Sequence, residues 1–135
     1  TQLYSAGTKN LLAAMGQHGV ERLVVISSEV AEHWARQGLL KLWIVLPLPQ
    51  HFLGATYDDM RRMDIVLWES DARWTAIRAP RIQPVRPGKA KNRYRLSTSA
   101  PLPRGWMITA PDMATALLDI AERNDLNRSH VYVAN

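Results

Sequence analysis

The sequence predicts an α/β fold with a mainly parallel sheet, and three observations lead to this expectation. The runs Leu23–Ile26 and Trp74–Arg78 are mostly apolar at consecutive positions, which is typical of strands buried on both faces. Segments with apolar residues at helical spacing precede and separate these two runs. Alternation of strands and helices favours parallel pairing through crossover connections.

The first third of the chain predicts a helix, a turn and a buried strand. The helix is expected from Ser5 to His18, with Ser5 or Thr8 as its cap. Gly19 is expected to end it. The strand Leu23–Ile26 follows and stops at two serines.

The middle of the chain predicts a short helix, an irregular connection and a long helix. The short helix is expected over Glu29–Gln37, and the apolar stretch Leu39–Leu53 is expected to be irregular because it holds two prolines. Asp58 or Asp59 is the expected cap of the long helix, which runs to Ser70. One face of that helix carries its apolar residues, Met60, Met63 and Leu67.

The second half predicts short strands around one further helix. The strand Trp74–Arg78 ends at Ala79 and Pro80, and the stretch Pro84–Gly88 is expected to be a loop. Pro111 and Asp112 are expected to open a helix to Asn124. The remaining expected strands are Tyr94–Ser97, Trp106–Thr109 and His130–Ala134.

Composition excludes several classes of protein. The chain has 135 residues and no Cys, which rules out a disulfide scaffold, a Cys-ligated zinc site and thiol catalysis. Its longest apolar stretch is too short to cross a membrane. No metal is expected, because the four His residues show no metal-ligand spacing: His18, His33, His51 and His130. The glycine pattern G-x-G-x-x-G of dinucleotide-binding loops is absent.

Basic residues are concentrated between Ala72 and Pro111, where no acidic residue occurs. This segment holds 9 of the 17 Lys and Arg residues, namely Arg73, Arg78, Arg81, Arg86, Lys89, Lys91, Arg93, Arg95 and Arg104. Such a segment is typical of a site for phosphate, either of a nucleotide cofactor or of nucleic acid. A solvated loop with an edge strand is the alternative interpretation.

The ends of the apolar runs indicate a candidate site. Ligands of open parallel sheets bind at the carboxyl ends of the strands. The residues at these positions are Ser27, Ser28, Ala79, Pro80 and Arg81. The two hydroxyls could hydrogen-bond a substrate carbonyl or a cofactor amide, and Arg81 could bind a phosphate or carboxylate. Alternatively, the serines only cap the helix that starts near Glu29.

Tyr57 and Arg61 have the Tyr-x-x-x-basic spacing by which a cation lowers the pKa of a phenol for proton transfer. Arginine has no accessible neutral form and differs from lysine in shape and hydration. A Tyr at a structural boundary and a solvated Arg are therefore the preferred interpretation.

Several stretches of sequence occur together with the spacing of one known family. They are Gly7–Met15, Gly19–Ser28, Asp58–Met63, Trp68–Ser70, Trp74–Arg81, Asp112–Ala114 and His130–Val133. In these stretches the chain resembles atypical short-chain dehydrogenases of the NmrA-like, NAD(P)H-binding group. The subgroup with flavin reductase and biliverdin IXβ reductase is the most similar. The match extends over nearly the whole chain and is poorest over Glu29–Leu53.

The resemblance implies that residues 1–135 are the C-terminal portion of an NAD(P)-binding, Rossmann-like domain. This portion would be a partial doubly wound parallel sheet without the N-terminal βαβ units, which carry the glycine-rich loop. NADP or NAD is the implied cofactor. Ser27 and Ser28 are the implied catalytic residues beside the nicotinamide, and with Ala79, Pro80 and Arg81 they are the implied cofactor-binding residues.

The chain departs from the family pattern at two places. Arg81 stands where the reductase subgroup carries a His after its Pro. The positions of the family's Tyr and Lys fall on Thr56 and Met60. A Tyr/Lys proton relay is therefore not expected here, and water is the expected proton source.

The resemblance implies a fragment of a cytoplasmic NAD(P)H-dependent oxidoreductase that transfers hydride to a flavin or similar planar acceptor. The isolated chain is expected to be inactive and to self-associate through an exposed sheet edge. The basic segment would face carboxylates or phosphates of the acceptor. The alternative is a non-catalytic, NAD(P)-sensing regulatory module of the NmrA-like type. Nucleic-acid binding is the least favoured function, and no membrane partner is expected.

Overall fold

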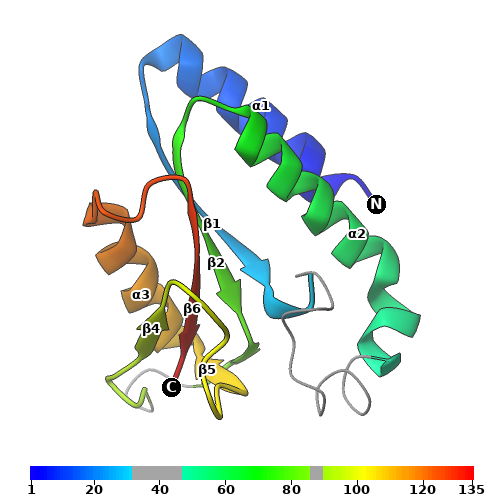
Figure 1. The fold of residues 1–135 in the computed structure, drawn as a ribbon, viewed down its shortest axis with the longest axis vertical. Coiled ribbons are helices and arrows are strands. Elements are labelled where there is room, and N and C mark those ends of the chain that lie inside the picture. Colours follow the sequence, from blue (N-terminus) through cyan, green and yellow to red (C-terminus); the bar gives the residue numbers. More distant parts are fainter. Residues whose placement is uncertain (32–46, 86–89) are drawn as a thin grey trace. The chain divides into compact units, whose positions relative to one another are not determined.

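The computed structural model describes residues 1–31, 47–85 and 90–135. These residues form two compact units (Figure 1). The first comprises Thr1–Glu21 and Val30–Ala72, and the second comprises Arg22–Glu29 and Arg73–Asn135. A short 3-10 helix, η1 (Glu29–Ala31), lies where the chain passes from the second unit back to the first.

The first unit is a pair of packed helices, α1 (Leu3–His18) and α2 (Pro47–Glu69). α1 ends as expected, because Gly19 adopts the left-handed conformation with φ 67° and its N–H bonds Met15. α2 begins well before the expected cap, so the expectation of an irregular connection is wrong from Pro47 onward. Both prolines lie in the first turn, where a missing N–H costs no intrahelical bond. The rest of that stretch, and most of the helix expected over Glu29–Gln37, lie outside the described residues.

Asp59 caps α1 rather than α2, which corrects two sequence expectations. Ser5 and Thr8 are not caps but buried residues within α1. The Oδ2 atom of Asp59 accepts the backbone N–H of Tyr4 at 2.7 Å, and its Oδ1 atom accepts the Ser5 hydroxyl at 2.5 Å. Burial alone would raise the pKa of the Asp59 carboxyl, but these hydrogen bonds and the charge of Arg62 hold it below its ordinary value. The first turn of α1 is thus fixed by a carboxylate 55 residues away.

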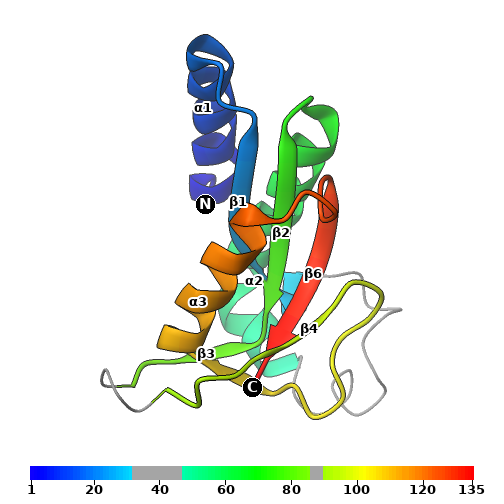
Figure 2. The same ribbon diagram turned by 90° about the vertical axis from the view of Figure 1, so that its left-hand side faces the viewer.

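The second unit contains a four-stranded sheet with the order β1-β2-β6-β4 (Figure 2). The strands β1 (Arg22–Ser28), β2 (Arg73–Ala79) and β6 (Ser129–Ala134) are parallel, and β4 (Arg95–Ser97) runs antiparallel to β6. A separate parallel pair joins β3 (Arg81–Gln83) to β5 (Met107–Thr109). All five strands expected from the sequence are therefore confirmed, as β1, β2, β4, β5 and β6, whereas β3 was not expected.

Helix α3 (Ala110–Glu122) packs its apolar face on this sheet. The shared core consists of Ile77, Ala79, Ile108, Met113, Ala116, Ile120, Leu126, Val131 and Val133. At the C-terminus of α3, the Arg22 guanidinium donates to the carbonyls of Ile120 at 2.7 Å and Ala121 at 3.3 Å. The Ile120 carbonyl also accepts the backbone N–H of Arg123 at 3.1 Å, so a cation from β1 adds to the hydrogen bonds at the end of this helix. Burial, and then the charge of Arg73, lower the pKa of Arg22.

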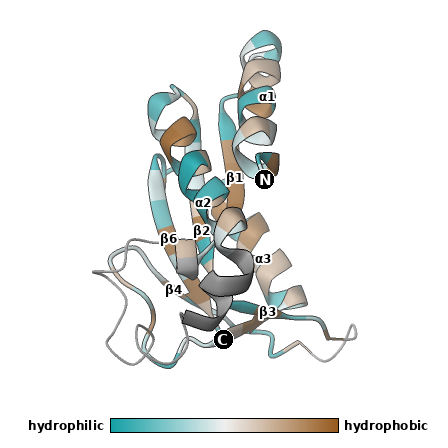
Figure 3. Ribbon diagram, turned by 90° about the vertical axis from the view of Figure 1, so that its right-hand side faces the viewer, coloured by the Kyte–Doolittle hydropathy of each residue, from teal (hydrophilic) through white to brown (hydrophobic). Residues whose placement is uncertain are grey.

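β1 is less buried than its apolar sequence predicts. Within the described residues it pairs only with β2, so it lies at one edge of the sheet. Its apolar residues are only partly buried, and Ile26 is 36% exposed, whereas β2 is buried from Trp74 to Ala79. Figure 3 shows the hydrophobic colour along the middle of β1. The expectation of burial on both faces therefore fails for β1 and holds for β2.

The alternation of helices with a mainly parallel sheet confirms the predicted Rossmann-like α/β class. The interpretation of the chain as the C-terminal portion of such a domain stays a prediction.

Candidate functional site

The register of β1 and β2 brings the predicted site residues to one edge of the sheet. Ser27 lies opposite Arg78, and Ser28 lies opposite Ala79. Pro80 follows directly, and Arg81 begins β3. Ser27, Ser28 and Ala79 therefore lie at the carboxyl ends of adjacent parallel strands, where this class of sheet binds its ligands, and Pro80 and Arg81 follow the end of β2.

The two serines lie on opposite faces of the sheet, because consecutive residues of a strand alternate in direction. Ser28 shares the face of Ala79, which belongs to the core with α3. It is half-buried. Ser27 shares the other face with Arg78 and is 2% exposed. The two hydroxyls are therefore not equivalent, and Ser28 is the more accessible one.

Arg78 is a further candidate site residue, which the sequence analysis did not single out for this edge. Its Nη1 atom donates to the Ser27 hydroxyl oxygen at 3.0 Å, and the residue is only 6% exposed. The available signal was a charged residue inside an otherwise apolar strand. Lys and Arg are almost never buried without a partner. A charged residue in a buried strand therefore predicts a nearby ligand or side-chain partner.

The basic segment supplies exposed cations to the second unit. Arg81, Lys91, Arg93 and Arg104 are exposed. The Arg95 guanidinium instead donates to two carbonyls, those of Pro103 at 2.9 Å and Asn135 at 3.0 Å. Two further cations of the sequence prediction, at positions 86 and 89, lie outside the described residues.

A carboxylate occupies the N-terminus of α3. The side chain of Thr109 is the N-cap, and its hydroxyl makes a short hydrogen bond to Asp112, which is buried in the first turn. The positive end of a helix dipole is a common phosphate site. Here the protein's own carboxylate fills that position, so α3 offers no cradle for a pyrophosphate.

Tyr57 and Arg61 do not form the arrangement that a proton relay requires. The Arg61 guanidinium donates to the Ala31 carbonyl at 3.1 Å and to Asp58 at 2.6 Å. Burial raises the pKa of the Tyr57 phenol, whereas a relay needs it lowered. The expected solvated Arg is therefore corrected in part, because the half-buried Arg61 side chain holds the Ala31 carbonyl and Asp58.

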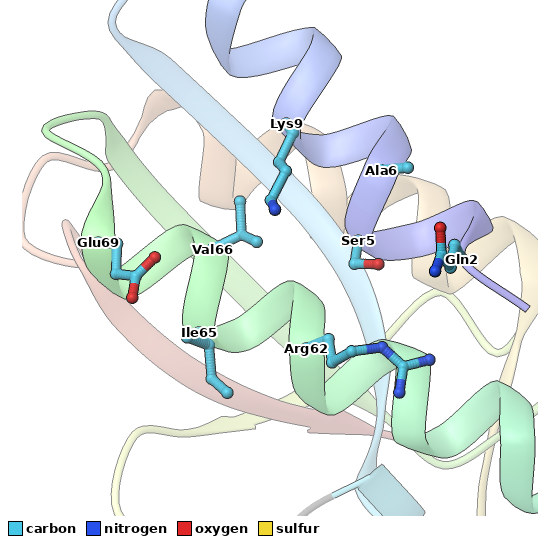
Figure 4. Close-up of a pocket in the computed structure, with 8 residues that line it drawn as sticks. All are labelled: Gln2, Ser5, Ala6, Lys9, Arg62, Ile65, Val66 and Glu69. Carbon is cyan, nitrogen blue, oxygen red and sulfur yellow. The ribbon is translucent and has the colours of Figure 1, made fainter.

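A hollow of about 300 Å³ lies between α1 and α2 of the first unit (Figure 4). Its lining residues are Gln2, Ser5, Ala6, Lys9, Arg62, Ile65, Val66 and Glu69. Arg62 at one end donates to the Thr1 carbonyl at 2.9 Å and lies 3.4 Å from Asp59, so its charge supports the cap of α1. Lys9 and Glu69 carry opposite charges along the same hollow, as Figure 4 shows.

Two other kinds of feature are absent from the described residues. They contain no group of three or more His, Asp or Glu side chains that could hold a metal ion. No helix among them is long and apolar enough to cross a membrane.

The two tryptophans near the basic segment differ in exposure, because Trp74 is fully buried and Trp106 is 45% exposed.

Comparison with protein families places these features in context. A family model described as NAD(P)H-binding matches residues 2–124. The chain belongs to this family. NAD or NADP is thus its cofactor, and the resemblance to atypical short-chain dehydrogenases of the NmrA-like group is confirmed. We found no significant match among curated protein sequences.

Solved structures with the same fold include several reductases. A short-chain dehydrogenase/reductase from Veillonella parvula, solved with NADP, superposes with a TM-score of 0.77 at 16% identity over 97% of this chain and 58% of its own. The anaerobilin reductase ChuY from Escherichia coli superposes with a TM-score of 0.76 at 12% identity, over 99% of this chain and 59% of ChuY. A putative exported protein from Burkholderia pseudomallei superposes with a TM-score of 0.78 at 22% identity, over 98% of this chain and 64% of its own. The chain thus spans about three fifths of these neighbours.

The described residues fit one half of the dinucleotide. The sheet edge offers a half-buried hydroxyl at Ser28 and a small residue at Ala79, followed by Pro80, which suits a flat ring with a polar substituent. The filled N-terminus of α3 and the absent glycine motif offer nothing for a pyrophosphate. Among the described residues, the sheet edge is therefore suited to the nicotinamide half, and the N-terminus of α3 is not suited to the pyrophosphate half.

Proposed function

We propose that this chain forms the nicotinamide and acceptor side of an NAD(P)H-dependent oxidoreductase that transfers hydride to a flavin or a similar planar acceptor. The observation that carries the proposal is the parallel register that sets Ser28 beside Ala79 and Pro80 at the carboxyl edge of the sheet. The family assignment supplies the cofactor class.

Each residue at this edge has a defined part in the proposal. The cofactor supplies the hydride when it is bound. Ser28 donates a hydrogen bond to the carboxamide oxygen of the nicotinamide and so fixes the ring. Ala79 leaves room for the ring plane, and Pro80 provides an apolar wall that excludes water. Ser27 contributes its hydroxyl from the other face.

The exposed cations indicate the chemistry of the acceptor. Arg81 lies next to Pro80, and Lys91 and Arg93 lie in the loop before β4. They carry positive charge in a segment without acidic residues. An acceptor with carboxylates or phosphates would be attracted and oriented by this charge. Arg81 is the cation closest in sequence to the carboxyl end of β2. We therefore propose that Arg81 binds the anionic group of the acceptor.

The proton that accompanies the hydride is proposed to come from water. Thr56 and Met60 stand at the positions of the family's Tyr and Lys, and neither side chain delivers protons. Flavins and related planar acceptors carry much of the reduction chemistry themselves. A site without a relay is therefore suited to such an acceptor.

Cofactor oxidation tests the proposal. The 135-residue chain is mixed with millimolar reduced nicotinamide mononucleotide, or with NADPH, and with FMN or a quinone, and the absorbance of the reduced nicotinamide is followed. The inactivity expected of the isolated chain should hold at micromolar NADPH, whereas millimolar cofactor should offset weak binding and give accelerated oxidation. Ser28→Ala should lower the rate roughly tenfold. Ser99→Ala, an exposed serine of the same unit, is the matched control.

A second function is favoured by one observation, the replacement of the family's Tyr and Lys by Thr56 and Met60. A regulatory module needs to bind NAD(P) but not to transfer protons. The same assay separates the two functions. Binding without accelerated oxidation of the cofactor by any flavin or quinone would establish the sensing module and contradict the reductase.

A further inference from the structure

A row of polar residues crosses the sheet one position before the edge just described. The register places Ser27 of β1 opposite Arg78 of β2, and Arg78 opposite Tyr132 of β6. Residues that are paired across parallel strands point to the same face. Ser27, Arg78 and Tyr132 therefore share the face opposite α3, and all three are at most 6% exposed.

The contact between Arg78 and Ser27 determines which way the hydroxyl can act. A serine oxygen has one proton to donate and two lone pairs to accept with. The Nη1 atom of Arg78 donates to this oxygen at 3.0 Å and so engages one lone pair. The hydroxyl proton is left to be donated, and a cationic donor on the oxygen strengthens that donation.

One partner of the buried Arg78 guanidinium is the hydroxyl of a candidate site residue. Removing a guanidinium from water costs free energy, and well-packed apolar residues of similar volume are often as stable as a buried charge. The position nevertheless carries a guanidinium directed at the hydroxyl of a candidate site residue.

We propose that Arg78 is a positioning residue that fixes the Ser27 hydroxyl as a hydrogen-bond donor toward a carbonyl or carboxamide oxygen at the carboxyl edge. This inference rests on the proposed function, because the ligand oxygen is that of the nicotinamide or of the acceptor. Arg78 itself does not touch the ligand. It acts through Ser27, and the ligand class it selects is an oxygen acceptor rather than a donor group.

A double-mutant cycle tests this coupling. The variants are Arg78→Met, Arg78→Lys, Ser27→Ala and the double Arg78→Met with Ser27→Ala, and the probe is reduced nicotinamide mononucleotide. We expect the first and third variants each to weaken binding roughly tenfold, as for a lost charge-assisted hydrogen bond. The double variant should be no weaker than either single one. Arg78→Lys should restore part of the affinity.

Arg73→Met is the matched control, since Arg73 is an exposed arginine at the other end of β2. It should leave the affinity unchanged. Additive losses in the double variant, or an equal loss in the control, would overturn the role of Arg78, because a merely structural residue has no reason to act through Ser27.

A ligand-independent measurement separates failure of this inference from failure of the proposed function. The scalar couplings between the α and β protons of Ser27 report its side-chain rotamer. The wild-type chain should show one rotamer, and Arg78→Met should show averaged couplings with the fold retained. An unchanged rotamer overturns the positioning role whether or not the chain binds a nicotinamide. A lost rotamer together with no binding by the wild-type chain contradicts the proposed function instead.

Discussion

The side chain of Asn135 donates a hydrogen bond to Asp112, with 3.0 Å between Nδ2 and Oδ2. The same amide nitrogen donates to the Arg93 carbonyl at 2.7 Å, and the amide oxygen accepts the Thr109 N–H at 2.8 Å. Asp112 also accepts the N–H of Lys91 at 3.0 Å. One amide and one carboxylate thus join the end of β6, the start of α3 and the loop that carries two of the exposed cations.

Asp112→Asn should lower the stability of the folded chain at neutral pH. The variant should also lose less stability than the wild type as the pH falls. The hydrogen bond from Thr109, and further hydrogen bonds from Asn135 and the loop, hold the pKa of Asp112 below its ordinary 3.8 despite burial. A carboxyl with a lowered folded pKa contributes stability above the ordinary value, and this contribution is lost as the pH falls through the folded value. Melting temperatures between pH 7 and pH 2 check this. The Asp71→Asn control, at an exposed carboxylate before β2, should keep the wild-type acid profile. Identical profiles for both variants would refute the assignment.

Ile120→Ala should cost about 3 kcal/mol of unfolding free energy, because the residue is fully buried in the core between α3 and the sheet. Leu118→Ala on the same helix should cost less than about 0.5 kcal/mol, since Leu118 is 70% exposed. Denaturant titrations of the two variants measure this difference. Equal losses would mean that α3 does not pack on the sheet by the face described.

Tyr94→Phe should make the stability of the folded chain less dependent on pH in the alkaline range. The Tyr94 hydroxyl donates to Asp119 at 2.7 Å, and burial together with this hydrogen bond raises its pKa to about 12. A raised folded pKa contributes stability that is present below the ordinary value of 10 and is lost as the pH rises toward 12. The variant should lose about 1 kcal/mol at pH 8 and should melt with a flatter profile above pH 10. Tyr4→Phe is the control, because Tyr4 bonds Asp59 through its backbone. A profile of Tyr94→Phe as steep as that of the wild type would count against the contact.

The chain should self-associate through β1. This seven-residue strand has an apolar centre and pairs with only one described strand, and such edges pair readily with other chains. Light scattering at several concentrations should show a mass that rises with concentration. Ile26→Lys should reduce this rise, whereas Val20→Lys, at an exposed residue outside the strand, should not. A monomer at every concentration would disprove association by this edge.

The strands and their ends could be predicted from the sequence because the signals are local. Short apolar runs that stop at serines or at Pro80 locate the carboxyl edge, and parallel topology then brings Ser28 and Ala79 together. The N-terminus of α3 was likewise marked by Pro111 and Asp112. These features depend on residues only a few positions apart.

The remaining features depend on contacts between distant residues. Asp59 carries the local signature of a cap for its own helix, yet it caps α1, because tertiary packing brings it to the first turn of that helix. The contact of Arg78 with Ser27 depends on the register of two strands 51 residues apart. The exposure of β1 depends on which strands neighbour it, and an apolar run alone does not specify this.

The most direct test of the nicotinamide site is a titration of the nitrogen-15-labelled chain with reduced nicotinamide mononucleotide, followed by proton–nitrogen correlation spectra. The account predicts shifts at the backbone amides of Ser27, Ser28, Ala79 and Arg81. Amides at the other ends of the same strands, those of Arg22 and Arg73, should stay in place. Shifts confined to the α1–α2 hollow, or no shift at millimolar ligand, would contradict a nicotinamide site at this edge of the sheet.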